Sequence, residues 1–436
     1  MSPFEAGIAG IVVFIILLIF RMPIAVAMGV VGFVGFAYIN NLNAALRVIS
    51  SDLYTTFASY SLSVIPLFVL MGFFAYHAGM GAKLYDLAYK AFGHLTGGLA
   101  MSSEVACAIF GAVCGSSTAT TATIGSIAIP EMRKYKYSPS LSAGCVAAGG
   151  ALGILIPPST IFVIYGVATQ QSIAELFLAG IIPGALLTLS YILAIWVVTK
   201  RNPALGPAGP DKPQLKVLLN ALRGGLLEVI IVFVVSIGGL FLGWFTPTEA
   251  GGVGAAGVLV VTLISRKLTF KGITAALADA TRTSAMIFFL IAGAIIFTRF
   301  MAISRIPFVL ANWVGSLPVP AFVILIMILL VYLVLGTFIE MIPLILLTIP
   351  IFFPVVVNVL GYDPIWFGVI IVMVVAMGVI TPPVGINVYV TKGVARDIPL
   401  ETIFRGIWPF LAAAVICCAV LIVFPQLATF LPNLLK

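Results

Sequence analysis

The chain has 436 residues, of which 62% are hydrophobic and only 8% are charged. Soluble globular domains carry about 25% charged residues, so this composition excludes a soluble domain and indicates a protein mostly embedded in a membrane. The net charge of +8 does not indicate nucleic-acid binding, because the Lys and Arg residues cluster in short gaps between apolar runs. That pattern is typical of the cytoplasmic loops of membrane proteins.

Apolar runs long enough to cross a bilayer recur along the whole chain. The first run is expected to remain as a membrane span, because no basic region precedes it and no small-residue cleavage site follows it. The first half predicts membrane helices at residues 5–20, 24–40, 61–79, 139–169 and 181–199. The second half predicts membrane helices at residues 226–243, 250–264, 284–303, 365–391 and 407–430. An amphipathic stretch between residues 77 and 94 predicts a helix that lies at the membrane interface.

A polar connection divides the chain into two similar halves. The segment "KRNPALGPAGPDKPQLK" (200–216) carries four prolines and several charges, which predicts exposure to water. We therefore place a first repeat at residues 1–225 and a second at 226–436. At an offset of 225 residues, "GILIPP" (153–158) aligns with "GVITPP" (378–383), and these segments contain the only two Pro-Pro dipeptides of the sequence.

Both Pro-Pro dipeptides lie inside predicted membrane helices. A proline in a helix removes a backbone donor and costs about 3 kcal/mol, so we expect the helices at 139–169 and 365–391 to be broken there. Interrupted apolar segments at corresponding positions of two halves point to a transporter built from internal repeats, with its binding site at the breaks.

Two further apolar segments, 99–130 and 320–354, are too long for one helix and are interrupted by Gly, Thr or Pro. We predict that each is a re-entrant hairpin that returns to its own side of the membrane. Five crossings then remain in each half, and an odd number inverts the second half relative to the first. With the N-terminus outside, most of the 22 Lys and Arg residues fall in inner loops, as the positive-inside rule requires. The predicted fold is an all-α integral membrane protein with inverted repeats.

The chemistry of the broken segments favours a small cation and an anion. The stretch "CGSSTATTATIGS" (114–126) holds seven hydroxyl residues, and each Pro-Pro break frees backbone carbonyls one turn earlier. Such oxygens suit a hard cation, whereas the half-helix N-termini favour an anionic group. The scarcity of carboxylates argues against a divalent cation and, less firmly, against proton coupling, so sodium is the natural candidate. The alternative is that the small residues only allow close helix packing.

The sequence resembles the large membrane subunit of tripartite ATP-independent periplasmic (TRAP) transporters over nearly its full length. The resembling stretches are "IPLFVLMGFF" (65–74), "GSSTATTATIGSIAIPEM" (115–132), "GGALGILIPPS" (149–159), "LFLAGIIPG" (176–184), "FTPTEAGGVGA" (245–255), "TPPVGINVYV" (381–390) and "FPQLATFLPNLL" (424–435). The resemblance implies an elevator architecture, in which the hairpins and broken helices form a mobile domain on a scaffold in the bacterial inner membrane.

The resemblance also implies sodium-driven import of an organic acid and no enzymatic activity. A soluble periplasmic binding protein would deliver the acid, and a small four-helix membrane subunit would accompany the chain among the membrane lipids. One sodium site would lie between the first hairpin tip and the first break, and its counterpart would lie in the second half. The implied sodium ligands are Gly115, Ser116, Ser117, Gly153, Ile156 and Pro157 in the first half, and Gly336, Thr337, Gly378, Thr381 and Pro383 in the second.

The candidate substrate-binding residues are Thr118, Thr160, Glu340 and Asn387. Glu340 is the one carboxylate near the predicted site, and an acid within a membrane segment is a functional candidate by default. Alternatively, Glu340 lies at a helix end, where backbone amides donate hydrogen bonds to its carboxylate. The sequence does not indicate which organic acid is bound.

Three other classes of membrane protein fit the sequence less well. An intramembrane serine protease would use Ser117 as nucleophile with a histidine as base, but His77 and His94 lie near predicted helix ends. An ion channel is compatible with the hairpins, although inverted halves with paired ion sites favour alternating access. An ATP-driven pump is excluded for this chain alone, because no Lys follows a Gly and a P-loop needs that pair.

Overall fold

The computed structural model describes residues 1–209 and 226–434. In these residues the chain is helical and contains no β-strand, which confirms that the fold is all-α. Seven described helices are long and apolar enough to cross a bilayer, and the bent pair Pro139–Leu155 and Thr160–Thr169 makes an eighth candidate. The predicted repeat boundary at residue 225 and part of the predicted linker lie outside the described residues.

The helices are numbered along the chain. The first part contains α1 (Pro3–Ile19), α2 (Ile24–Ile39), α3 (Leu42–Phe57), η1 (Tyr60–Ser63), α4 (Val64–His77), α5 (Met80–Phe92), α6 (Gly98–Cys114), α7 (Ser117–Lys134), α8 (Pro139–Gly150), α9 (Leu152–Leu155), α10 (Thr160–Thr169), α11 (Ile173–Arg201) and η2 (Pro203–Leu205). The second part contains α13 (Leu226–Phe241), α14 (Pro247–Ile264), α15 (Phe270–Ile303), α16 (Ile306–Ser316), α17 (Ala321–Phe338), α18 (Met341–Phe353), η3 (Pro354–Val359), α19 (Pro364–Gly378), α20 (Ile386–Val394), α21 (Leu400–Val423) and α22 (Gln426–Leu434).

Several helices differ from the hydropathy prediction. Helices α3 and α16 were not predicted, and α15 has 34 residues where a span at 284–303 was expected. The first turns of α15 carry Lys271, Asp279 and Arg282, so an apolar window detects only its later part. Helix α3 is likewise polar along one face, which hides it from a search for apolar spans.

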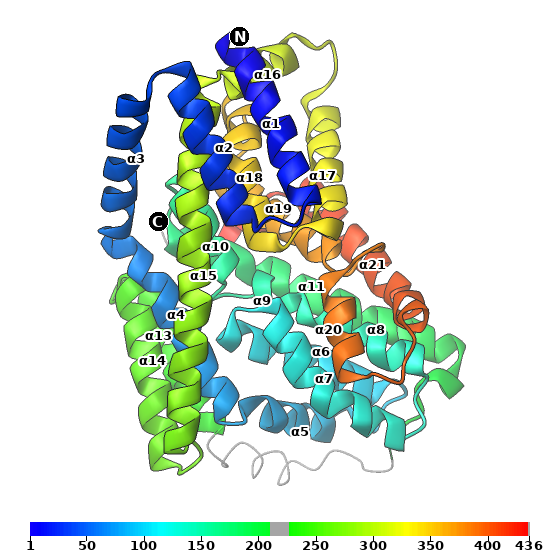
Figure 1. The fold of residues 1–436 in the computed structure, drawn as a ribbon. Coiled ribbons are helices and arrows are strands. Elements are labelled where there is room, and N and C mark those ends of the chain that lie inside the picture. The colour runs from blue at the N-terminus through cyan, green and yellow to red at the C-terminus, as the bar shows by residue number, and fades with distance from the viewer. Residues whose placement is uncertain (210–225, 435–436) are drawn as a thin grey trace.

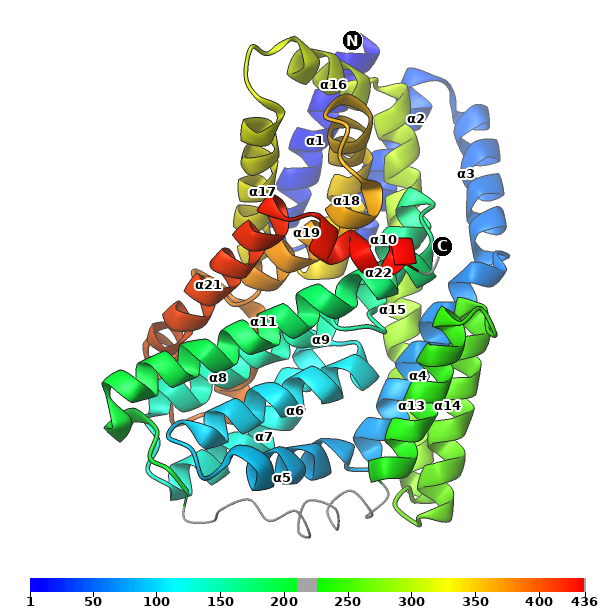
Figure 2. The ribbon, with the colours of Figure 1, turned by 180° about the vertical axis from the view of Figure 1, so that it is seen from behind.

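The helices form two groups, which Figures 1 and 2 show from opposite sides. In one group the long α15 packs against α2 and α4, and α14 packs against α4 and α13. In the other group α8 packs against α6, α7 and α21, and α11 packs against α21 and α6. Helix α5 links the groups: it follows α4 in the chain and lies beneath α6 and α7 in Figure 1.

Glycine and serine residues set the ends of the helices that border the candidate site. Gly115 ends α6 in the left-handed region at φ +62°, a conformation that glycine adopts without a steric cost. Ser116 then caps α7 by accepting a hydrogen bond from Ala119 N at 3.4 Å. Ser159 caps α10 in the same way, accepting from Phe162 N at 3.4 Å. Serine is a preferred N-cap residue, so α7 and α10 both begin beside the site.

Helices α2 and α15 approach each other through glycines. A Cβ atom on Gly32 would lie 2.7 Å from the Ile296 carbonyl carbon. A Cβ atom on Gly293 would lie 2.3 Å from the Ala25 carbonyl oxygen. Small residues at such crossings let membrane helices bring their backbones together, and here they hold the long α15 to the N-terminal helices.

We predict that Gly32→Ala destabilises the protein, because the new methyl group meets the backbone of α15. Overpacking of this kind costs about 1–3 kcal/mol. Gly29→Ala on the same helix is the matched control, since nothing lies within 4 Å of its Cβ position, and it should be neutral or slightly stabilising. Thermal unfolding of both purified variants measures the difference, and equal melting temperatures would contradict the close crossing.

Candidate ion and substrate site

The first Pro-Pro pair lies in a break between α9 and α10. Ser159 Oγ donates a hydrogen bond to the Ile154 carbonyl on the far side of this break. Among the described residues, nothing donates a hydrogen bond to the carbonyls of Ile156, Pro157 or Pro158. Free carbonyls at membrane depth are tolerated only where they line a cavity or meet a ligand, so these oxygens are available to a cation.

The tip of the first hairpin, formed by α6 and α7, touches this break. Thr160 Oγ1 donates to the Gly115 carbonyl at 3.2 Å. A Cβ atom on Gly111 would lie 2.4 Å from Gly153 Cα, and one on Gly153 would lie 3.2 Å from the Ser116 carbonyl oxygen. Tip and break are therefore in backbone contact, and the predicted residues Gly115, Ser116 and Gly153 lie side by side.

The second half repeats this contact between the hairpin of α17 and α18 and the break after α19. A Cβ atom on Gly378 would lie 2.8 Å from Gly336 Cα. The pairs Gly111–Gly153 and Gly336–Gly378 are related by the same offset of 225 residues. Among the described residues, no hydrogen bond reaches the carbonyls of Ile380, Thr381, Pro382, Pro383 and Val384.

A cavity of about 440 Å³ lies between the two hairpin tips. Three of the four predicted substrate residues, Thr118, Thr160 and Glu340, line this cavity. Gly115, Ser116 and Ser117 of the first tip line it too, and α15 closes one side with Thr283, Met286 and Ile287. Gly336, Thr337 and the carbonyl residues of the second break are not among its lining residues.

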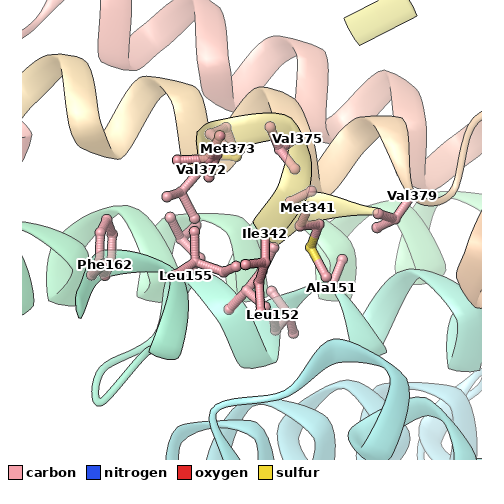
Figure 3. Packing of buried hydrophobic residues seen from close by; sticks show 14 of the residues in the cluster. Ala151, Leu152, Leu155, Phe162, Met341, Ile342, Val372, Met373, Val375 and Val379 are labelled. Carbon is pink, nitrogen blue, oxygen red and sulfur yellow. The ribbon is translucent and has the colours of Figure 1, made fainter. Parts of the chain in front are cut away.

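Apolar packing holds the second tip over both breaks. Figure 3 shows Met341 and Ile342, at the start of α18, beside Leu152 and Leu155 of α9 and Val379 after α19. These residues are buried and belong to one hydrophobic cluster. Segments from the two halves of the chain therefore interlock at this point, and the second tip is fixed by residues of the first half.

Asn387 has a different position from the other predicted substrate residues. Its side chain is fully buried, and its Nδ2 donates to Ser117 Oγ at 2.8 Å and to the Ala147 carbonyl at 3.0 Å. Ser117 Oγ is also 3.0 Å from Asn387 Oδ1. Asn387 is not among the residues that line the cavity, so its amide joins α20 to the first hairpin tip and to α8.

A second cavity, of about 490 Å³, lies next to α3 and is lined by Asp52 and Arg299. The two side chains form an ion pair, with Arg299 Nη2 at 2.9 Å from Asp52 Oδ1. None of the predicted site residues lines this cavity. Its acid and its base already satisfy each other, so the cavity between the hairpin tips remains the better candidate site.

Sequence reasoning gave no role to Glu104 in α6. The residue is fully buried, and neither carboxyl oxygen has a hydrogen-bond partner among the described residues. A Cβ atom on Gly149 of α8 would lie 2.8 Å from Glu104 Oε2 and 2.9 Å from Cys107 Sγ. The signal was present in the sequence, because Glu104 is the one charged residue within an apolar helix, and an intramembrane acid is unusual.

Comparisons with known proteins identify the family of the chain. A family model described as "Tripartite ATP-independent periplasmic transporter, DctM component" matches residues 11–427. The C4-dicarboxylate TRAP transporter large permease protein DctM of Pseudomonas aeruginosa is 36% identical over 89% of this chain and 90% of that protein. The chain belongs to the DctM family.

Other relatives of this DctM-family chain are named for different substrates. The sialic acid TRAP transporter large permease protein SiaM of Vibrio cholerae is 33% identical, over 86% of this chain and 87% of that protein. The fold is similar to that of the YdaH transporter of Alcanivorax borkumensis, with a TM-score of 0.66 and 16% identity over 88% of this chain and 90% of the other.

Family membership fixes the general role of the chain. It is a multi-pass protein of the bacterial inner membrane and a transport subunit, not an enzyme. Large permease subunits of this family work with a small membrane subunit and a periplasmic binding protein. The protease alternative is not favoured, because the relatives are named as transporter permeases and Ser117 Oγ is bonded to the amide of Asn387 and to no histidine among the described residues.

We predict that Glu104→Met stabilises the DctM-family chain, because a buried polar group without a partner costs about 1–3 kcal/mol. Glu401→Met, at an exposed position of α21, is the control and should leave thermal unfolding unchanged. A lower melting temperature for Glu104→Met than for the control would show that the carboxyl has a stabilising partner in the folded protein.

Proposed function

We propose that the DctM-family chain imports an organic acid together with sodium. In this proposal a periplasmic binding protein delivers the acid, and a small four-helix membrane subunit completes the transporter. The observation that carries the proposal is the pair of helix breaks, where free carbonyls lie beside the hairpin tips. Sodium entering with its gradient would supply the energy for accumulating the acid.

The ligand chemistry of the breaks favours sodium. Uncharged carbonyl oxygens and nearby hydroxyls suit a hard cation of low charge, whereas calcium sites typically use several carboxylates. Among the described residues no group of three or more His, Cys, Asp or Glu side chains lies close enough to hold a metal ion. We therefore assign Gly153, Ile156 and Pro157 to one sodium site and Gly378, Thr381 and Pro383 to the other, each completed by its hairpin tip.

The cavity favours an anionic group near the first tip. Helices α7 and α10 both begin beside it, at Ser116 and Ser159, and Ser116 and Thr160 line it. A helix N-terminus carries about half a positive charge and attracts carboxylates. The relatives named for C4-dicarboxylates and for sialic acid support an organic acid as the substrate class.

We further propose an elevator motion, with both hairpins re-entrant. The moving body would consist of the two hairpins with the broken helices, which interlock through the glycine contacts and through Met341 and Ile342. Helices α2, α4, α14 and α15 would form the scaffold, since α15 packs along α2 and α4. Helix α5 would be the connecting arm between them.

Sodium dependence is the first test of this function. We expect uptake in proteoliposomes to stop when choline replaces sodium at constant pH and voltage, because choline is too large for a shell of carbonyl oxygens. Uptake should also require the cognate binding protein. Transport that continued in choline would contradict the proposed coupling, whatever the substrate.

The two glycine contacts give a second test. In Gly153→Ala and Gly378→Ala the new methyl group meets the backbone of the facing tip, so the oxygens around each ion must shift. We expect the sodium concentration for half-maximal uptake to rise about tenfold or more, since losing one good oxygen contact costs about 1–3 kcal/mol. Gly393→Ala in α20, whose Cβ position has nothing within 4 Å, should leave it unchanged, and an equal effect in all three variants would contradict the assignment.

A further inference from the structure

An apolar groove separates the two groups of helices. It has a volume of about 710 Å³ and is lined by residues of α5, α6, α11 and α13. Figure 2 shows α6 and α11 on one side of it, α13 on the other and α5 below. Thr188 is the one polar residue among the described residues that line the groove, and its Oγ1 donates to the Gly184 carbonyl at 2.8 Å. The walls therefore offer no polar group that needs a ligand or a water molecule as a partner.

The groove opens at the apolar outer surface of the protein. Its lining residues Ile109 and Leu189 are 39% and 61% exposed. Water would lose hydrogen bonds between such walls, and an empty space would forfeit van der Waals contacts along them. Within a bilayer the hydrocarbon chain of a lipid is therefore the occupant that suits the walls.

Charged side chains gather at one end of the groove. Lys83 lies on α5 beside the lining residue Leu84, and Glu228 directly precedes the lining residue Val229 of α13. The side chain of Lys267, in the turn between α14 and α15, comes close to that of Lys83. Residues from three separate segments thus bring two cations and one carboxylate to the place where α5 meets α13.

The positive charge at this end exceeds the negative charge. Burial first, and the neighbouring Lys267 second, lower the pKa of Lys83 to about 8. Glu228 acts on this pKa in the opposite direction and more weakly than Lys267. A further anion between the two lysines would relieve their repulsion. Basic pockets between membrane helices, close to the membrane surface, typically bind anionic lipid headgroups.

We propose that an anionic phospholipid occupies this groove. One acyl chain lies against α6, α11 and α13, and the phosphate lies between Lys83 and Lys267. A free phosphate would satisfy the lysines alone and a zwitterionic lipid the apolar walls alone, so the two parts of the site together select a molecule that carries both features. Ile156 of the first helix break also lines the groove, so the lipid contacts both groups of helices. This inference depends neither on sodium nor on the transported substrate.

Lipid binding to the purified protein tests the proposal. The full-length chain with its small subunit is stripped of lipid in detergent and mixed with phosphatidylglycerol, with phosphatidylcholine of the same acyl chains, or with glycerol 3-phosphate. Native mass spectrometry counts the bound molecules as a function of concentration. Lys83→Gln removes a charge at the end of the groove, and Ala185→Phe places a ring in it from α11. Arg405→Gln in α21 and Ala256→Phe in α14 are the matched controls, since both residues are exposed and neither lines the groove.

We expect one phosphatidylglycerol to bind per chain, about tenfold more tightly than phosphatidylcholine, with no binding of glycerol 3-phosphate at the same concentrations. Lys83→Gln should weaken phosphatidylglycerol binding about fivefold, which corresponds to about 1 kcal/mol for one basic residue near a membrane surface, and should leave phosphatidylcholine unaffected. Ala185→Phe should weaken the binding of both lipids, and the controls should weaken neither. Equal binding of the two lipids, binding of neither, an unchanged preference in Lys83→Gln, or glycerol 3-phosphate binding as tightly as phosphatidylglycerol would each overturn the proposal.

Discussion

The structure depends on one constraint: backbone carbonyls at membrane depth need partners. A continuous helix provides these partners internally, and this chain interrupts two helices with Pro-Pro pairs that cannot provide them. A hairpin tip lies in backbone contact with each of the two breaks. A shell of neutral oxygens that is incomplete within the protein is a binding site for a small cation, so the helix breaks and the proposed coupling to sodium have the same physical origin.

Glycine makes this arrangement sterically possible. At these two contacts the backbones are so close that a Cβ atom on Gly111, Gly153 or Gly378 would lie 2.4, 3.1 or 2.8 Å from the Cα atom of the facing glycine. The tip can therefore reach the broken helix without an intervening side chain. Because both contacts recur at one offset, the two halves solve the same packing problem in the same way. The Ser117–Asn387 bond then joins the first tip to the second half, so neither tip is positioned by its own half alone.

Local patterns in the sequence predicted the helical fold, the two breaks and the turns between the paired helices. These features were predictable because proline, glycine and serine determine the backbone conformation of the residues next to them. Contacts between distant segments were not predictable in this way. Asn387 was assigned to the substrate, yet its amide is bonded to Ser117 and Ala147. The sequence shows that Glu104 is charged within an apolar helix, whereas its lack of a hydrogen-bond partner follows only from the packing of α8 against α6. The polar start of α15 hid the first part of that helix, because its charged residues lower the mean hydropathy there.

The proposed division between backbone ligands for the ion and side-chain ligands for the substrate would explain how one architecture can serve relatives named for different substrates. Carbonyl oxygens are present whatever the side chain, so an ion site built from helix breaks survives most substitutions as long as the prolines and glycines keep the backbone in place. The cavity, in contrast, is lined by side chains from two hairpin tips, and a single replacement there changes its charge. Glu340 is the one charged side chain among the described residues that line it. Under the proposed function, substrate choice can therefore change at the tips while the proposed ion sites at the breaks stay the same.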